Sequence, residues 1–442
     1  MNMLPFLQAR KELDSDLFLH RMLLPPHAVI LAGFNSLIDL PQTILMLQQQ
    51  AQSAVAVDNP LLALGSGIGS AMKDPTERTI WDAIAEGHLV VLSESSDRCI
   101  KIVPVGRSLS RAIESPSTEN VLRGAISAFN EDLDTNIGLV KKHMLSEQLR
   151  IRPYIFGQDQ RRRTVLLYME GKVHEHLLRS ILRKIESRKA TDIPDLQALS
   201  DLLGFPKWTL FTRFNTTELP QDAAYALRNG KAVLLLDRFP FAVVLPSLLS
   251  DMYISENDRN SPSVFRLFFQ VLRILGILTN ILMPGLYVAL VSVNPEVLRI
   301  ELALSIAGSR EGVPYPALIE TLLMLFVLEL TLESSIRLPK SIGPTITMIG
   351  GIILGQAVVQ AKLVSNILII VLAATTIANF TVIGFHNANA IRLYKYLLLV
   401  LSAMYGVLGL FVGIVLICAY LGHVNSFGIP YLSRWKTGGR NG

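Results

Sequence analysis

Hydrophobic and polar positions divide the chain into two parts with different patterns. Up to residue 263, short apolar runs such as Ala28–Phe34 and Thr164–Met169 alternate with polar turns and with segments of helical periodicity. Runs of this length are typical of strands and are too short to cross a membrane. Beyond residue 263, apolar stretches of spanning length follow one another. The pattern therefore predicts an α/β N-terminal region followed by an all-α polytopic membrane domain.

The α/β region contains two stretches of similar pattern. Each has a glycine before a hairpin of two apolar strands, and these glycines, Gly87 and Gly230, lie about 143 residues apart. A strand, a turn and a helix precede each hairpin, so we infer a duplicated unit, with a chance likeness of two amphipathic hairpins as the alternative. An amphipathic helix starting near Pro116 is expected to join the copies. The expected domains are a cytoplasmic subdomain at 1–112, a linking helix at 113–145, a second cytoplasmic subdomain at 146–262, a transmembrane domain at 263–425 and a short tail at 426–442.

About five segments are expected to cross the membrane. One of them, Val313–Leu328, is interrupted by Glu320. If the N-terminus lies inside, five spans place the C-terminal tail outside, whereas a re-entrant segment at Ser305–Pro316, or a last run that does not cross, would bring it inside. The other four segments are uncharged and exceed roughly 18 residues: Ile274–Val293, Ile342–Ala361, Leu363–Phe385 and Tyr396–Leu421.

Polar residues inside this apolar region are the candidate functional groups. In Ser305–Glu320, neighbouring charges precede Pro314 and Pro316, which oppose a continuous helix. Charges at membrane depth usually face a protein interior or a water-filled path. For the asparagines, hydrogen bonding between helices is the alternative to lining an ion path. The candidate pore or gate residues are Arg310, Glu311, Glu320, Glu329, Glu333, Asn379, His386, Asn387, Asn389 and Arg392.

Two features predict close contacts between helices. On one helix, Glu329 and Glu333 share a face and Glu320 lies nearly opposite, so this span needs protein or water on two sides. That requirement favours an oligomer or a lumen. Glycines four residues apart supply small surfaces for helix packing, within the chain or between subunits. These helix-packing glycines are Gly351, Gly355, Gly409 and Gly413.

Composition agrees with a membrane protein and excludes other classes. Of the 442 residues, 50% are hydrophobic and 17% are charged, below the roughly 25% charged that is usual in soluble proteins. Residues 1–263 hold 29 basic and 30 acidic residues, whereas 264–442 hold 12 and 6. The near-neutral first part argues against nucleic-acid binding. Because no phosphate-binding, zinc or serine-hydrolase motif is present, we expect no enzyme activity, no cofactor and no metal.

Several motifs resemble one family. SREGVPYPALIE, IRLPKSIGPT, GQAVVQAKLVS, NANAIRL and SFGIPYLS occur in this order within the last third of the chain. They are similar to the membrane region of the A subunit of GerA-type spore germinant receptors. The segment SPSTENVLRGAISAFNEDLDTNIGLVKK resembles the part that joins two N-terminal subdomains in that family. The resemblance covers roughly residues 105–433 and is weaker before residue 100. The chain departs from the family pattern in lacking a long polar leader and in its short tail.

This resemblance implies a function and partners. The family's A subunits lie in the spore inner membrane with a cytoplasmic N-terminal region, and they work with a transporter-like B subunit and a C-subunit lipoprotein. They are thought to form a homo-oligomeric ring that acts as a nutrient-gated ion channel. A role in monovalent cation release at germination is therefore expected, with membrane lipid as a further partner. The alternatives are an accessory germination complex without nutrient sensing and a secondary transporter.

Overall fold

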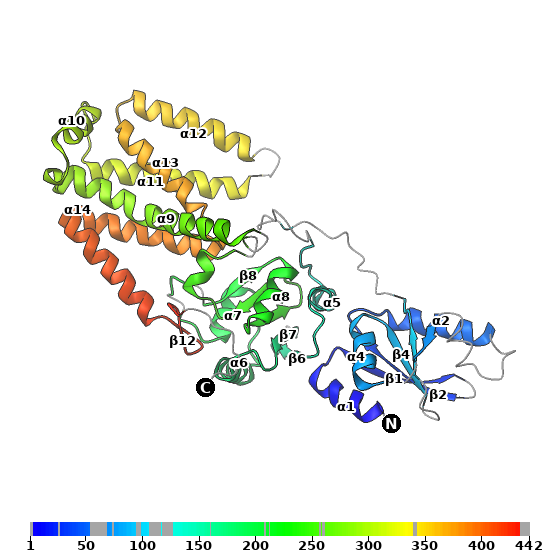
Figure 1. Cartoon of the computed structure of the whole chain (residues 1–442). Coiled ribbons are helices and arrows are strands. Elements are labelled where there is room, and N and C mark those ends of the chain that lie inside the picture. Colours follow the sequence, from blue (N-terminus) through cyan, green and yellow to red (C-terminus); the bar gives the residue numbers. More distant parts are fainter. Residues whose placement is uncertain are drawn as a thin grey trace.

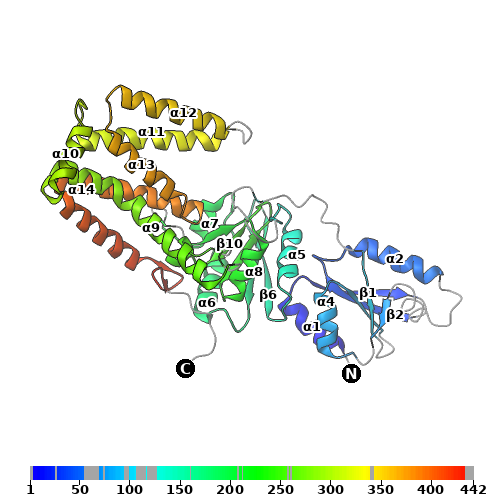
Figure 2. The ribbon, with the colours of Figure 1, turned by 45° about the horizontal axis from the view of Figure 1, so that its top comes forward.

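The molecule consists of two α/β units and a C-terminal helical region (Figure 1). The first α/β unit and the helical region lie on opposite sides of the second unit, which contacts both (Figure 2). The computed structural model describes residues 3–24, 27–53, 69–72, 75–93, 99–105, 116, 127–159, 161–206, 209–211, 213–255, 258, 261–338 and 343–433.

The first α/β unit is a five-stranded antiparallel sheet with helices on both faces. Its strand order is β1-β2-β4-β5-β3. Side chains alternate between the faces, because Ile30 and Ala32 of β2 pack with α1 and α4, whereas Val29 and Leu31 pack with α2. The elements are α1 (Met3–Leu13), β1 (Leu17–Leu24), β2 (His27–Phe34), α2 (Leu40–Ser53), β3 (Gly69–Ala71), α4 (Glu77–Ala85), β4 (Leu89–Ser93) and β5 (Cys99–Ile102).

The second α/β unit repeats this design. Its sheet has the order β6-β7-β9-β10-β8 and is also antiparallel. Val233 and Leu235 of β9 face α5 and α8, and Leu234 faces α6 and α7. The elements are α5 (Leu133–His143), β6 (Leu149–Phe156), β7 (Arg162–Met169), α6 (Glu175–Ser187), α7 (Leu196–Leu202), β8 (Asn215–Thr217), α8 (Pro220–Arg228), β9 (Ala232–Leu236) and β10 (Ala242–Leu245).

The equivalent strand order of the two units is what a duplicated sequence would produce. The two glycines that marked the repeat are also equivalent in the structure. Gly87 ends α4 with a φ of 89°, and Gly230 ends α8 with a φ of 80°. A left-handed glycine after the last helical residue is a common way to end a helix before a strand.

The helix between the two sheets is shorter than expected. A helix was expected over 113–145, but α5 begins at Leu133, where the Asp132 side chain accepts the N–H of Thr135. Residues 127–131 are not helical, and 117–126 lie outside the described residues. The apolar residues Leu133, Ile137 and Val140 of α5 are buried in the core of the second unit.

Among the described residues of the helical region, two helices are long and apolar enough to cross a membrane, Ser263–Val293 and His386–His423. The first of these ends in a π-helical turn at Ala289–Val293. Within the expected span Leu363–Phe385, the helix covers only Asn366–Asn379, which is 14 residues. The helices are α9 (Ser263–Val288), α10 (Ile300–Ser309), α11 (Ala317–Arg337), α12 (Gly343–Gln360), α13 (Asn366–Asn379) and α14 (Phe385–His423).

The longest helix, α14, is interrupted at Gly406. This glycine has φ 62° and ψ −141°, which is not a helical conformation. The first arm (385–405) runs away from the α/β units and the second arm (407–423) returns toward them, drawn in orange and red in Figure 1. The expectation of one continuous span at Tyr396–Leu421 is therefore wrong, because that run contains the turn between the two arms.

The C-terminal end docks onto the second α/β unit. After α14, the strands β11 (Asn425–Ser426) and β12 (Ile429–Pro430) form a small hairpin, and Phe427 belongs to the core of that unit. Because α9 starts beside the same unit, both ends of the helical region lie next to the second α/β unit (Figure 1). Five spans are not confirmed.

Candidate functional site

The first polar cluster lies between α11, α13 and the turn before α11, and we call it the Glu320 cluster. Glu320 is fully buried, and its Oε1 accepts the backbone N–H of Ser365 at 2.5 Å. Its Oε2 lies 3.4 Å from Nε of Arg310. The hydroxyl of Tyr287 on α9 lies 2.9 Å from Oγ of Ser365. The Glu320 carboxylate therefore joins α11, the start of α13 and the turn, and the Ser365 hydroxyl joins α13 to α9.

The chain builds this cluster from two helix starts. Pro316 precedes the first residue of α11, which leaves Glu320 in the first turn of that helix. Ser365 caps α13 by accepting the N–H of Leu368 at 3.3 Å. The positive end of the α13 dipole and its free N–H groups favour a carboxylate at this point. Two motifs that are distant in sequence, SREGVPYPALIE and GQAVVQAKLVS, thus meet at the Glu320 carboxylate.

Arg310 also closes the turn in front of α11. It follows the last residue of α10, and its Nη2 donates to the carbonyl of Tyr315 at 3.1 Å. The break in the helix falls at Pro314 and Pro316, between α10 and α11, as the prolines predicted. Glu311 is exposed in this turn and lies outside the cluster.

The second polar cluster joins α11 to α14, and we call it the Glu329 cluster. Oε1 of Glu329 lies 3.1 Å from Nζ of Lys395 and accepts from the hydroxyl of Tyr396 at 3.2 Å. Its Oε2 pairs with Arg392, whose Nη1 also donates to Asn389 at 3.1 Å. Two cations surround one carboxylate, so the cluster has a net positive charge. Glu329 remains 22% exposed, which leaves the cluster open on one side.

The other candidate residues lie apart from these two clusters. Glu333 is exposed and pairs with Arg337 one helical turn away, at 2.8 Å. The Asn387 side chain is buried and donates to the carbonyl of Ile383 at 3.1 Å. His386 is partly exposed at the start of α14. The ten candidates therefore do not form one site.

A buried asparagine pair joins α9 to α13. Nδ2 of Asn280 donates to Oδ1 of Asn379 at 2.8 Å, and Asn280 is fully buried. Sequence reasoning found Asn379 but missed Asn280. A single asparagine inside the apolar run of α9 was the available signal, since an amide at that depth needs a partner.

The four packing glycines fall into two different environments. A Cβ atom on Gly409 would overlap the carbonyl of Leu401, and one on Gly413 would overlap the side chain of Leu398, so these glycines pack the two arms of α14 together. Gly351 and Gly355 on α12 have no atom within 4 Å of such a Cβ. One pair is therefore used inside the chain, and the other faces open space.

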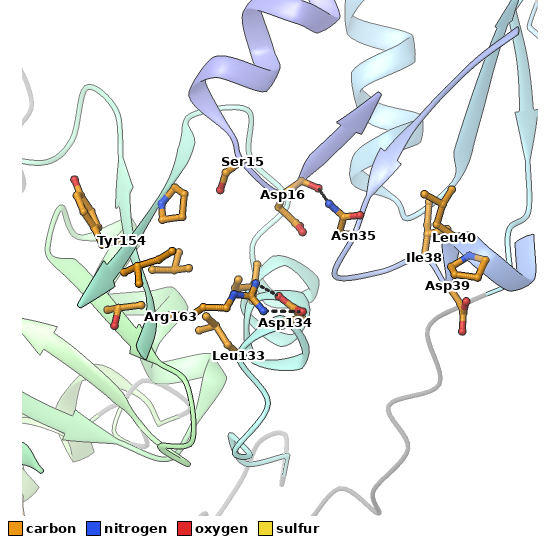
Figure 3. A pocket seen from close by; sticks show the side chains of 16 residues that line it. Ser15, Asp16, Asn35, Ile38, Asp39, Leu40, Leu133, Asp134, Tyr154 and Arg163 are labelled. Carbon is orange, nitrogen blue, oxygen red and sulfur yellow. Dashed lines mark hydrogen bonds and ion pairs between the residues drawn. The ribbon is translucent and has the colours of Figure 1, made fainter. Parts of the chain in front are cut away.

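A cleft separates the two α/β units, and Figure 3 shows the side chains around it. Its volume is about 570 Å³, within the range of pockets that hold small molecules. Arg163 and Asp134 pair across one wall at 2.9 Å (Figure 3). The lining includes Ser15, Asp16, Asn35, Asp39, Leu133, Tyr154 and Thr164.

Beside this cleft, a buried lysine fastens the units together. Nζ of Lys141 on α5 lies 2.7 Å from Asp16 and 3.2 Å from Asp14, both in the first unit. Asp16 also accepts from the hydroxyl of Ser36 at 2.6 Å. Burial raises the pKa of Asp14, although Lys141 acts in the opposite direction. Sequence reasoning missed this group because its members are more than a hundred residues apart.

Fold and site together define a membrane-associated protein with paired α/β units and buried charges in its helical part. Within the described ranges, no group of three His, Cys, Asp or Glu side chains is arranged to hold a metal ion. The chain belongs to the GerA family, because the family model described as "Bacillus/Clostridium GerA spore germination protein" matches residues 12–438. The resemblance found in the sequence motifs is thereby confirmed, and a role in spore germination follows.

Curated relatives carry corresponding names. The chain is 31% identical to spore germination protein GerLA of Bacillus cereus over 383 residues, which are 87% of this chain and 78% of that protein. It is 30% identical to spore germination protein A1 of Bacillus subtilis (strain 168) over 360 residues, 81% of this chain and 74% of that one. The crystal structure of the N-terminal domain of the A subunit of the Bacillus megaterium spore germinant receptor GerK3 aligns with a TM-score of 0.41. Sequence identity is 14%, and the alignment covers 56% of this chain and 94% of that one.

Proposed function

We propose that this chain is the A-type subunit of a spore germinant receptor and forms part of a nutrient-gated path for monovalent cations. The observation that carries the proposal is the Glu320 cluster, in which two family motifs converge on one fully buried carboxylate that pairs with Arg310. Buried charges in a membrane-length region are costly and mark functional positions. The chain acts without enzymatic chemistry, by changing the arrangement of helices that surround the path.

The helical region crosses the spore inner membrane six times in this proposal, with both ends and the α/β units in the cytoplasm. The crossing segments are α9, α11, α12, α13 and the two arms of α14, which alternate in direction (Figures 1 and 2). At about 1.5 Å per residue, the 14-residue α13 spans only about 21 Å and needs its flanking turns to cross.

Several copies assemble into a ring around the path in this proposal. The face of α12 that contains Gly351 and Gly355 supports a contact between copies, because these glycines have no neighbour within one chain. A transporter-like B subunit and a C-subunit lipoprotein complete the receptor, and membrane lipid covers the remaining apolar surface. The Glu329 cluster, which has an excess positive charge and one open side, is placed to respond to a change between α11 and α14.

The experiment measures potassium release from spores after addition of nutrient. Glu320→Gln keeps a group that can accept the N–H of Ser365 but removes the charge, and Arg310→Lys keeps the charge but alters its geometry. We expect both variants to change the rate of release at normal protein level. Glu311→Gln, in the same turn but outside the cluster, is the matched control. Unchanged release in both cluster variants would remove the Glu320 cluster from the mechanism.

An accessory role without nutrient sensing is the second candidate. The chain is 27% identical over 366 residues, 83% of its length, to an uncharacterized membrane protein, YfkQ, of Bacillus subtilis (strain 168). The chain is about as similar to YfkQ as it is to several germination proteins. Co-purification of the chain with a transporter-like subunit supports the receptor role, and purification without one favours the accessory role.

A further inference from the structure

The C-terminal hairpin enters the second α/β unit immediately after the last membrane helix. Phe427 and Gly428 connect its two strands with φ of 54° and 82°. Two consecutive left-handed residues are typical of the tight turn that joins hairpin strands. The hairpin therefore has a defined shape that presents Phe427 at its tip.

The tip is seated in a specific site. Phe427 is 5% exposed, and its ring centroid lies 5.2 Å from that of Phe205. Nζ of Lys184 on α6 lies 4.8 Å from the Phe427 centroid, within the range of a cation–π contact. A Cβ on Gly428 would approach the His176 ring to 2.5 Å, and the φ of 82° at this position favours glycine.

Hydrogen bonds hold the hairpin on both sides of its tip. Nη1 of Arg213 donates to the carbonyl of Asn425 at 2.9 Å, and the hydroxyl of Ser426 donates to the carbonyl of Arg213 at 2.9 Å. The carbonyl of Tyr431 accepts the N–H of Leu249 at 3.0 Å. These bonds fix the chain direction as well as the position of the hairpin.

The opposite end of the second arm of α14 is also fixed. At the turn between the arms, Oδ1 of Asn294 accepts the N–H of Val407 at 3.0 Å. A Cβ on Gly406 would overlap this oxygen. Asn294 follows the π-helical end of α9, so the second arm is anchored to α9 at one end and to the second α/β unit at the other (Figure 1).

We propose that the hairpin Asn425–Tyr431 and the second arm of α14 form a rigid link that transmits the position of the second α/β unit to the far end of the helical region. This inference rests on the proposed function, because transmission matters only if that unit controls the membrane path. When the second α/β unit shifts, the hairpin shifts with it and the second arm of α14 slides along the first arm. This movement strains the hydrogen bond between Asn294 and Val407.

The test compares Phe427→Ala with Leu432→Ala, which changes an exposed residue just beyond the hairpin. The full chain is purified in lipid nanodiscs, and hydrogen exchange is measured at the Val407 amide. We expect at least tenfold faster exchange in Phe427→Ala and no change in Leu432→Ala. Gly428→Ala, which strains the turn and displaces the His176 ring, gives the same result if Phe427→Ala does not fold. Unchanged exchange at Val407 overturns the link.

Potassium release from spores gives the second measurement. Spores that carry Phe427→Ala at normal protein level should lose nutrient-triggered release, while those that carry Leu432→Ala should retain it. Suppose that deletion of the whole chain abolishes potassium release while Phe427→Ala leaves it intact. That result would overturn the proposed transmission even if hydrogen exchange at Val407 has changed. If deletion of the whole chain leaves release unchanged, the proposed function fails, and the exchange experiment still decides whether the link exists.

Discussion

Replacing Gly406 with alanine should destabilise the helical region by about 2–4 kcal/mol. The glycine adopts φ 62° and ψ −141°, a conformation that costs other residues about 1–3 kcal/mol. The new Cβ would also overlap Oδ1 of Asn294. Displacing this oxygen loses its hydrogen bond to the N–H of Val407, which contributes about 1 kcal/mol. The two contributions add because one change causes both.

The matched control is the same substitution at Gly351 on α12. Gly351 has no atom within 4 Å of a new Cβ, and alanine in a helix interior is favoured over glycine by about 0.5–1 kcal/mol. Thermal unfolding of the purified chain in detergent should show Gly406→Ala melting roughly 5–10 °C below the parent. Gly351→Ala should melt at or slightly above it. Equal melting temperatures for the two variants would refute the turn between the arms of α14.

Three further predictions concern charged groups. Lys141→Met leaves two buried carboxylates without their cation. It should lower the free energy of unfolding of the α/β region by about 3–5 kcal/mol in denaturant titrations followed by tryptophan fluorescence, and an unchanged midpoint would contradict the buried pair. Glu329→Gln should lower the melting temperature more than Glu333→Gln, whose ion pair is exposed, and equal shifts would argue against the Glu329 cluster. Burial lowers the pKa of His143, and the charge of a neighbouring arginine lowers it further. The unfolded chain therefore takes up the proton first, and stability should fall as the pH drops below about 6.5. His143→Asn should flatten this dependence in unfolding titrations between pH 7 and 5, and an unchanged slope would argue against a role of His143.

Local patterns predicted much of the α/β region. The equivalence of the hairpins after Gly87 and Gly230 was visible because a strand, a turn and a neighbouring strand are encoded within about fifteen residues. The group around Lys141 was not predictable, since its carboxylates lie 125 and 127 residues away. The hydrophobic periodicity of one segment gives no information about contacts with residues that far away along the chain.

Hydropathy predicted where the apolar helices lie along the chain, but it did not predict the turn at Gly406 that reverses the direction of α14. The run Tyr396–Leu421 is uncharged and long enough to span, so its composition indicated one crossing. The turn at Gly406 has no proline or charge beside it. Its structural cause is Asn294, which caps the second arm from another helix. A contact between distant segments therefore stabilises this turn, and counting apolar runs could not reveal it.

The positions of Glu320 and Glu329 on nearly opposite faces of α11 predicted a need for a neighbouring subunit or a lumen. In the structure, each carboxylate finds its partners within the same chain. Glu320 meets Arg310 and the N-terminus of α13, and Glu329 meets Lys395 on α14. Because both charges are compensated inside one copy, they no longer require an oligomer. The case for a ring therefore rests on α12, where Gly351 has no neighbour within 4 Å of a new Cβ. A larger side chain there should disturb assembly and leave the fold of the single chain intact. Gly351→Leu tests this in size-exclusion chromatography with light scattering, and a variant that keeps the parent's oligomeric mass would remove the α12 face from the subunit contact.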